Sequence, residues 1–400
     1  MGMREFYHCS MKRVVITGLG VTSCLGTDLE TYWAALLSAQ SAPLVVTDGN
    51  ARIENELVYA IRGDAPPSPP PGIGLLGRSS QFAITAARSA FRDAGLDPDG
   101  YTGAGIAVGT GFGDTGLYED AVAGHPMPSG DDAYPFKVSS VLACEFGFTG
   151  PTTSISTACS ASAYGVSLAA DLIRAGEADI MLAGGTDAYA QTGGACFKRM
   201  GALDSEVCRP FDARREGTVF GEGAAMMILE SEDHARARGR LTDYGAVEGA
   251  GWSCDGYHPT APDEGGRHIV RAMRDALADA AVAPGDVGCV VPHGTGTPLN
   301  DAVEGKALGE VFGDGPGSPC VYSLKAMVGH TAGAAGAFAL LTGALIIKHG
   351  MVPANVKLRE PDLSCGVTLH TDGPRPLPVS RVLINAYAFG GNNITVVIGR

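Results

Sequence analysis

Residues 152–176 read TTSISTACSASAYGVSLAADLIRAG, and this stretch decides the predicted fold. It starts as a β-branched strand, turns through small residues around Cys159, and continues as a helix that ends on a charged residue and a glycine. Residues 320–350, CVYSLKAMVGHTAGAAGAFALLTGALIIKHG, repeat this plan. Ala- and Gly-rich helices could also resemble each other through composition alone. We predict a duplicated α/β unit whose two helix starts share one central site.

The rest of the chain alternates short β-branched runs with helical periodicity, which predicts parallel strands with helices on both faces. The predicted strands are Arg13–Thr17, Gly105–Gly109, Thr152–Thr157, Asp179–Ala183, Ala224–Glu230, Cys289–Pro292, Cys320–Ser323, Val382–Ala386 and Ile394–Gly399. The predicted helices are Leu29–Gln40, Ser79–Ala94, Ala161–Ala175, His268–Ala281, Asp301–Val311 and Thr331–His349. Each half is predicted to close on a Gly-Gly turn, in IMLAGGTDA and in LINAYAFGGNNITVVIG. The proline-rich segment Gly63–Gly74 is expected to be a surface loop.

The overall composition excludes several classes of protein. A chain of 400 residues with 45% hydrophobic content can bury a full core without disulfides. The net charge of −14 argues against nucleic acid as a partner, because phosphate binding needs a clustered basic surface. The ten cysteines show no CxxC or Cys/His ligand spacing, so we expect no metal site and a reducing, cytoplasmic location.

Two segments could be mistaken for export or membrane signals. The first twenty residues lack an apolar stretch followed by a small-residue cleavage site, so we expect no signal peptide. Translation could begin at Met11, which leaves open whether residues 1–10 are native. The apolar run Thr331–Ile347 consists mostly of Ala and Gly and is short for a bilayer. We expect a buried core helix there and no membrane association.

Cys159 is the candidate nucleophile. It follows a predicted strand and precedes a helix, where unpaired backbone N–H groups and the helix dipole stabilise a thiolate. Its small neighbours, Ala158 and Ser160 to Ser162, leave room for a substrate. The alternative is a buried structural cysteine, which is the commonest state of a free cysteine. We therefore predict a lowered pKa for this thiol if it is the nucleophile.

Three further residues complete a candidate site. His293 lies in VVPHGTGTPLND, where a strand ends in a loop of glycines and threonines that exposes donors to a ligand. His330 lies at the start of the second small-residue helix, as the expected counterpart of Cys159, and Lys325 precedes it by five residues. One cysteine, two histidines and one lysine at such positions favour covalent catalysis without a metal. A cysteine hydrolase remains an alternative, although it would typically need only one histidine.

The C-terminal AYAFGGNNITVVIG places Phe389 before two glycines, between two strands. Its backbone N–H could donate to an oxyanion, together with the N–H of Cys159. The alternative is a plain hairpin with an aromatic cover. The fragment VITGLGVTSCLG lacks the spacing and downstream acid of a dinucleotide-binding loop, so we expect no nucleotide cofactor.

Together these motifs resemble the β-ketoacyl synthases of fatty-acid and polyketide synthesis, especially the elongating type in the thiolase superfamily. The resemblance runs from about Met11 to Arg400. It rests on STACSAS, FDARREGTVFGEGAAMMILE, PHGTGTPLND, SLKAMVGHTAGAAG and AFGGNN. It implies a thiolase-like, duplicated five-layer α-β-α-β-α sandwich that is normally dimeric. Residues 1–255 would form the half with the nucleophilic cysteine and residues 256–400 the half with both histidines, together one structural unit.

The resemblance also implies roles for the candidate residues. Cys159 would accept an acyl chain from a carrier-protein thioester. His293 and His330 would assist the decarboxylation of malonyl units and stabilise the enolate and the oxyanion. Lys325 would orient the site, with Glu304 as its partner. The resemblance further implies that Thr295 and Thr297 contact the phosphopantetheine arm, that Phe389 gates the acyl tunnel, and that Phe197 lines it.

The implied reaction is decarboxylative Claisen condensation, with no cofactor beyond the phosphopantetheine of the carrier. The expected partners are an acyl carrier protein and a second subunit, in a homodimer or in a heterodimer with a chain-length-factor-like subunit. The intact catalytic residues argue against such a factor itself. A degradative thiolase is a less favoured alternative, because no second cysteine stands in a matching motif. A non-catalytic scaffold subunit is least favoured.

Two further features concern the gate and the carrier. The family's Asn-Ser-Phe reads Asn385-Ala386-Tyr387 here, and its Gly-Gly-Thr-Asn turn ends in Asn392-Asn393. These departures put details of the gate in doubt. Carrier proteins of these pathways are acidic, so Lys198 and Arg199 in CFKRMGALD are candidates for docking, although an ordinary solvated pair is the alternative.

Overall fold

Ten strands form one mixed sheet, which divides into two matching sets of five. The computed structural model describes residues 12–41, 43–46, 56–62, 67–130, 132–240, 243–315, 317–376 and 380–400. From the edge inward, the first set is β5 (Thr152–Ile155), β4 (Gly105–Gly109), β6 (Ile180–Asp187), β8 (Gly223–Ser231) and β1 (Val14–Ser23). The second set is β11 (Cys320–Val321), β10 (Cys289–Val291), β14 (Arg381–Tyr387), β15 (Asn392–Gly399) and β9 (Ala246–Cys254).

The two sets have the same connectivity, so the predicted duplication is confirmed. In each set the first strand in the chain is innermost, and the remaining four follow in the same order and directions. Among the described residues, the strands of the two sets pair with each other only at β1 and β9, where Val14 pairs with Val247 and Val15 with Ala246. The prediction of a parallel sheet is wrong for the inner strands. β8 runs antiparallel to β6, and β15 runs antiparallel to β14.

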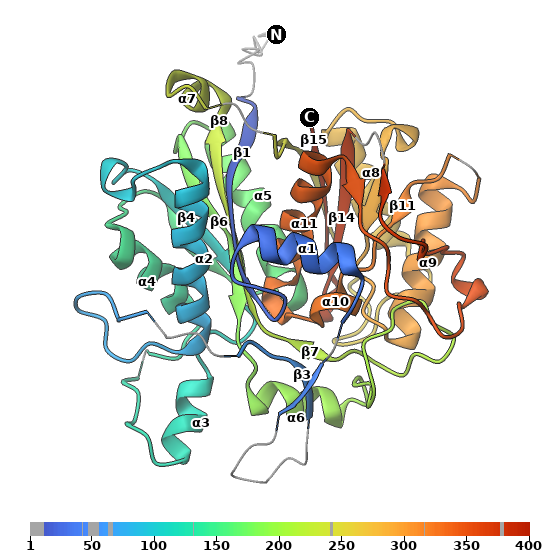
Figure 1. Ribbon diagram of the computed structural model, residues 1–400, viewed down its shortest axis with the longest axis horizontal. Coiled ribbons are helices and arrows are strands. Elements are labelled where there is room, and N and C mark those ends of the chain that lie inside the picture. Colours follow the sequence, from blue (N-terminus) through green and yellow to red (C-terminus); the bar gives the residue numbers. More distant parts are fainter. Residues whose placement is uncertain are drawn as a thin grey trace, which may run out of the picture.

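Helices fill three layers around these strands (Figure 1). The central layer is α5 (Ala161–Arg174) and α11 (Ala335–His349), which contact strands of both sets. The outer layers are α2 (Arg78–Ala94) and α4 (Phe136–Phe146) on the first set, and α8 (Arg267–Asp279) and α9 (Pro298–Phe312) on the second. Separate hydrophobic clusters fill the central and the two outer interfaces. The expected five-layer sandwich is therefore confirmed.

The apolar segment near residue 340 is a core helix, as predicted. Within the described part of the chain, Ala332–His349 is long and apolar enough to cross a membrane by length and composition, but 89% of it is buried inside the protein. Every residue of α11 from Ala335 to Ile347 is buried. Its close contact with α5 depends on Gly336, because a Cβ there would come within 2.7 Å of the Cβ of Ala163.

Shorter elements complete the chain. The remaining helices are α1 (Leu29–Ser38), α3 (Gly116–Val122), α6 (Gln191–Arg199), α7 (Glu232–Ala237) and α10 (Lys325–Val328). The remaining strands are β2 (Leu44–Val46), β3 (Glu56–Tyr59), β7 (Phe220–Gly221), β12 (Met351–Val352) and β13 (Arg375–Pro376). The 3-10 turns are η1 (Pro98–Gly100), η2 (Ala158–Ser160), η3 (Pro284–Asp286), η4 (Ala332–Ala334), η5 (Leu363–Cys365) and η6 (Phe389–Gly391).

The two Gly-Gly pairs that were both predicted to form turns lie in different structures. The first Gly-Gly pair, Gly184–Gly185, lies inside β6 and not in a turn, because β6 packs so closely on α5 that a Cβ at Gly185 would meet Ser162. The second pair does lie in a turn, η6. The division after residue 255 stays a prediction; β9 precedes it and pairs along its length with β15 of the second set.

Some sequence predictions fall on residues that the structure does not describe. Met11, the proposed translation start, lies outside the described residues. So do residues 63–66 of the proline-rich segment. Its described remainder, residues 67–74, is mostly exposed, as expected for a surface loop.

Candidate active site

The two halves of the fold start their central helices in the same way. Ala158 (φ 48°) and Ala332 (φ 46°) both have left-handed backbones, each begins a 3-10 turn, and an α-helix follows three residues later. Cys159 is therefore matched by Gly333, and the expected equivalence of Cys159 with His330 is wrong. His330 lies three residues before Gly333, where the turn enters the site.

The fold brings most of the predicted residues to one cavity of about 290 Å³. Its lining includes Cys159, Phe197, His293, Thr295, Thr297, His330 and Phe389. Lys325 and Glu304 are buried and act on His293 without lining the cavity. A second, larger cavity of about 1140 Å³ beside α3 contains neither Cys159 nor the histidines. The small cavity is the candidate active site because it joins the only predicted nucleophile to both histidines.

The thiol of Cys159 is protonated in the free protein at neutral pH. Burial raises its pKa to about 11, and the nearby Asp187 carboxylate acts in the same direction. The Lys325 charge and the backbone N–H groups of Cys159 and Phe389 lower the pKa, but by less. The predicted lowering of this pKa is therefore wrong for the free protein. The helix start supplies stabilising donors, but desolvation outweighs them.

His330 presents a hydrogen-bond donor to the cavity. Its Nδ1 accepts the N–H of Ala332 at 3.2 Å, which leaves the proton of the neutral ring on Nε2. Burial, aided by the Lys325 charge, holds its pKa well below the usual range, so the ring is neutral. The backbone of His330 bonds to Val219 at 2.8 Å and to Gly221 at 3.0 Å. The motif FDARREGTVFGEG thus fixes the position of this ring.

A carboxyl group and an ammonium group both hold the backbone of His293. Its N–H and that of Gly294 each donate to Glu304 at 2.7 Å. The ammonium of Lys325 donates to the His293 carbonyl and lies 3.4 Å from its Nδ1, which favours the Nε2–H tautomer. Burial and the charge of Lys325 hold the pKa of His293 well below its usual value. The two rings meet edge to face with centroids 5.5 Å apart.

The partnership predicted for Lys325 and Glu304 is one of charge, because burial lowers the pKa of Lys325 and the Glu304 carboxylate opposes this shift. These two residues, both in the described part of the chain, do not form a direct ion pair; each binds His293 instead. Burial raises the pKa of the Glu304 carboxyl to about 7, although the N–H donors of Gly294 and His293 oppose this shift. Both groups therefore position the histidine backbone.

The turn after β14 covers the cavity. The ring of Phe389 lies 5.5 Å from that of Phe197, centroid to centroid, and Phe197 packs on Phe220 at 4.8 Å. Gly390 has φ 83° and donates its N–H to Pro259 at 2.7 Å. Phe389 can thus serve both as an aromatic cover and as an oxyanion donor, because it lines the cavity and its backbone N–H acts on the thiol of Cys159.

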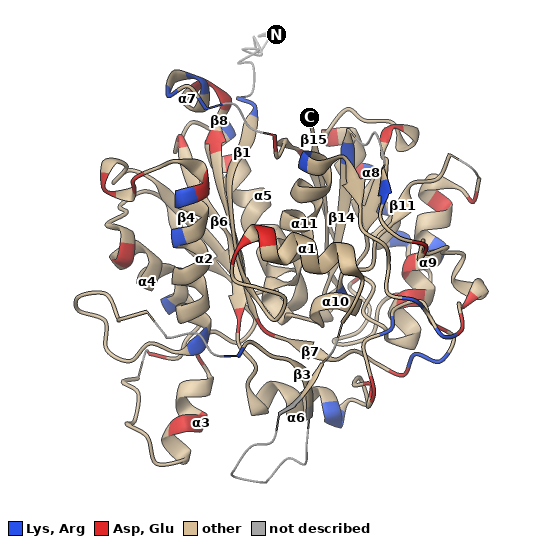
Figure 2. Ribbon diagram, in the orientation of Figure 1, with Lys and Arg blue, Asp and Glu red and all other residues tan. Residues whose placement is uncertain are grey.

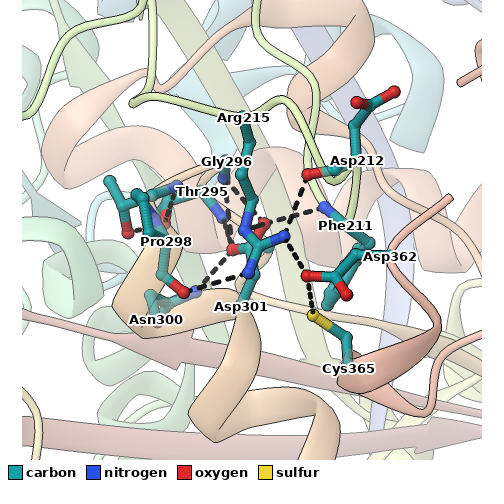
Figure 3. Close-up of polar contacts among 12 residues, drawn as sticks. Phe211, Asp212, Arg215, Thr295, Gly296, Pro298, Asn300, Asp301, Asp362 and Cys365 are labelled. Carbon is teal, nitrogen blue, oxygen red and sulfur yellow. Dashed lines mark hydrogen bonds and ion pairs between the residues drawn. The ribbon is translucent and has the colours of Figure 1, made fainter. Parts of the chain in front are cut away.

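A network centred on Asp301 holds the threonine loop (Figure 3). Its carboxylate accepts the N–H groups of Phe211 at 2.8 Å, Thr295 at 3.0 Å and Gly296 at 3.2 Å. Sequence reasoning missed this residue. The signal was present, because an acid in the first turn of a helix that follows a Gly-Thr loop commonly binds free backbone N–H groups.

Other lining residues were also missed as site residues. Asp255 and Asn393 line the cavity and bond to each other at 2.7 Å. Tyr387, noted only as a departure from the family, lies beside His293 with ring centroids 5.8 Å apart. Among the described residues no cluster of three or more His, Cys, Asp or Glu side chains could hold a metal ion.

A buried thiol, two imidazole N–H donors and two backbone N–H donors, set between the halves of a duplicated five-layer fold, define a thiolase-like condensing enzyme. Comparison with known proteins gives the family. Residues 11–235 match the model of the β-ketoacyl synthase N-terminal domain, and residues 244–359 match that of the C-terminal domain. The chain belongs to the β-ketoacyl synthase family.

Relatives span nearly the whole chain. A 3-oxoacyl-[acyl-carrier-protein] synthase 2 of Coxiella burnetii is 33% identical and covers 97% of this chain and 99% of its own. Nodulation protein E of Rhizobium meliloti strain 1021 is 36% identical, and the match covers 96% of this chain and 98% of that protein. The solved structure of the ishigamide ketosynthase/chain length factor matches with a TM-score of 0.89 and 36% identity. The match covers 98% of this chain and 99% of that one.

Proposed function

We propose that this enzyme elongates acyl chains that are carried on an acyl carrier protein. In the first step the sulfur of Cys159 attacks the carrier thioester, the acyl group moves to Cys159, and the carrier leaves as a free thiol with the proton. In the second step a malonyl carrier enters the same cavity. The observation that carries this proposal is the pair of neutral histidines that present Nε2–H donors beside Cys159.

The decarboxylation needs donors and no strong base. The carboxylate of malonyl leaves as carbon dioxide, and its bonding electrons form an enolate that the N–H groups of His293 and His330 stabilise. The enolate carbon attacks the acyl carbonyl on Cys159, whose oxygen becomes an oxyanion held by the N–H groups of Cys159 and Phe389. The C–S bond then breaks, the thiolate of Cys159 takes up a proton, and the 3-oxoacyl group remains on the carrier. No cofactor beyond the carrier's phosphopantetheine takes part.

The exposed end of α6 suits an acidic carrier. Lys198 and Arg199 are exposed in its last turn, and the next residue, Met200, lines the cavity. Figure 2 shows basic residues at this end of α6. A carrier docked there would have its arm directed at the threonine loop. We place the enzyme in the cytoplasm, where such carriers are found.

A second subunit would cover one flank of the first half. Tyr134 (52%) and Phe136 (56%) are exposed there with stacked rings, at the start of the helix α4 that packs against β5, and Val122 and Met127 are exposed in the preceding segment. The neighbouring β5 is the edge strand of its set, so its outer backbone groups can pair with another strand. We propose either a homodimer or a heterodimer with a chain-length-factor-like subunit.

The central experiment is acylation of the purified enzyme. Incubation with an acyl carrier thioester should give an acyl adduct on Cys159 by mass spectrometry, and Cys159→Ala should give none. Adding malonyl carrier should release 3-oxoacyl carrier and carbon dioxide. Hydrolysis without condensation would point to a cysteine hydrolase, and condensation of two acetyl thioesters without malonyl would point to a thiolase. Activity only after co-expression with a second subunit would identify the heterodimer.

A further inference from the structure

Thr295 and Thr297 turn their hydroxyls toward each other at the cavity wall. Their Oγ1 atoms are 2.8 Å apart, and the hydroxyl of Thr297 does not cap the helix α9 that starts after it. Two hydroxyls carry two hydrogens and their mutual bond uses one, so the other can be donated to a ligand. Its direction depends on the backbone of residues 295–297.

That backbone is fixed by Asp301, which is itself held by Arg215. The Nε of Arg215 lies 3.7 Å from Oδ2 of Asp301, which makes this contact a buried ion pair and not a hydrogen bond. Its other nitrogens donate to the carbonyls of Asp212 at 2.9 Å and Pro298 at 3.1 Å, and to the carboxylate of Asp362 at 2.6 Å (Figure 3). The side chain is only 7% exposed and does not line the cavity.

The guanidinium thus joins three segments of the chain around the threonine loop. Arg215 comes from the first half, while Pro298 and Asp301 belong to α9 and Asp362 precedes η5. A guanidinium presents five N–H donors in a fixed planar fork and so reaches a carboxylate and two carbonyls in different directions, whereas a lysine ammonium offers three donors from a single nitrogen.

We infer that Arg215 is a positioning residue for the Thr295–Thr297 hydroxyls and thereby sets the affinity for the amide-bearing phosphopantetheine arm. This inference rests on the proposed function. The residue acts through Asp301 and Pro298 and touches no substrate. Substitution of Arg215 should therefore lower the efficiency of acylation more for substrates that carry the whole arm than for substrates that lack it.

The test compares two donors of the same acyl group. One is the acyl carrier protein, and the other is the ethanethiol thioester, which lacks both amides and the phosphate of the arm. The efficiency of Cys159 acylation from each is measured by mass spectrometry. In Arg215→Gln the ratio of the two efficiencies should fall about tenfold through weaker binding of the carrier thioester. Arg215→Lys should recover only part of the ratio.

The matched control is Arg274→Gln, which removes the same charge from an exposed ion pair with Glu310. It should leave the ratio unchanged. A wild-type ratio in Arg215→Gln, or an equal fall in the control, would overturn the inference. If Arg215→Gln does not fold, the ratio in Arg215→Lys decides in the same way. Absence of any adduct in the wild type would refute the proposed function itself, whereas equal use of both donors would refute only the role of the arm.

Discussion

Cys159 shows how burial controls a reactive residue. A thiolate is the nucleophile, and burial raises the pKa of this thiol to about 11. In the proposed reaction, the carbonyl of an entering thioester would therefore reach a thiol that still carries its proton. The nearby charge of Lys325 partly offsets the cost of forming the thiolate.

Alkylation of Cys159 should depend steeply on pH. Between pH 7 and 9 the thiolate fraction, and with it the rate of reaction with iodoacetamide, should rise about tenfold per pH unit. Lys325→Met removes a charge that lowers the pKa of Cys159, so alkylation at pH 8 should slow roughly threefold or more. Lys348→Met serves as the control because Lys348 packs on Tyr244, away from the cavity. Faster alkylation in Lys325→Met would contradict this account.

The Glu304 carboxyl should make stability depend on pH. Burial raises its pKa from the ordinary 4.5 to about 7, so the folded protein binds this proton more tightly than the unfolded chain does. The contribution to stability is fully present below pH 4.5 and is lost as the pH rises to 7. Relative to Glu304→Gln, the wild type should lose up to about 3 kcal/mol over this range. Urea denaturation at pH 5, 6 and 8 measures the difference, and a constant difference would refute it.

At the scale of elements, the contact of α11 with α5 depends on one glycine. In Gly336→Ala the new methyl would meet the Cβ of Ala163 at 2.7 Å and its backbone nitrogen at 2.8 Å, so the melting temperature should fall by an amount equivalent to about 1–3 kcal/mol. Gly343→Ala, on the same helix, meets only side-chain carbons at 3.0 Å or more. It should be neutral or stabilising, because alanine favours a helix over glycine. Equal effects of both variants would argue against tight packing as the cause.

The last turn of α6 provides a test of carrier docking. Reversing both charges in Lys198→Glu/Arg199→Glu should weaken binding of the acidic carrier about tenfold or more in a titration at low salt. Alkylation of Cys159 should stay at the wild-type rate, since neither residue lines the cavity. Unchanged affinity would remove α6 from the docking surface.

The sequence predicts elements well where apolar residues are periodic or continuous, and poorly where glycine permits a close approach. β4 and the cores of α2, α5 and α11 follow from periodicity. β9 was missed because its buried positions include Gly249 and Gly251, where α8 packs directly on the backbone. Cys159, His293, His330 and Lys325 were found because they lie in distinctive motifs, whereas Asp301, Asp255 and Asn393 were missed. The protonation states of Cys159 and the two histidines could not be predicted, because desolvation depends on how the folded layers bury these side chains.

At the scale of the whole molecule, the exposed hydrophobic flank predicts association. The wild type should have twice the chain mass in light scattering, either alone or with a co-expressed partner. Phe136→Asp places a charge on this flank at the start of α4, where an acid is compatible with the helix, so the variant should fold and be monomeric. Asp286→Asn, on an exposed turn of the second half, is a control. A wild type that remains monomeric with every partner tried would contradict the proposed assembly.

The matched helix starts have a consequence for the ancestry of the enzyme. A duplicated precursor would have had two equivalent positions for a nucleophile, with backbone donors at each. In the present chain one position retains a sulfur, whereas Gly333 occupies the other and donates its N–H to Asp187 at 2.6 Å. The carboxylate of Asp187, from the first repeat, thus accepts the backbone N–H at the matching position of the second repeat. Of the two matched positions only the first carries a thiol, while the second repeat supplies His293 and His330 to the same cavity.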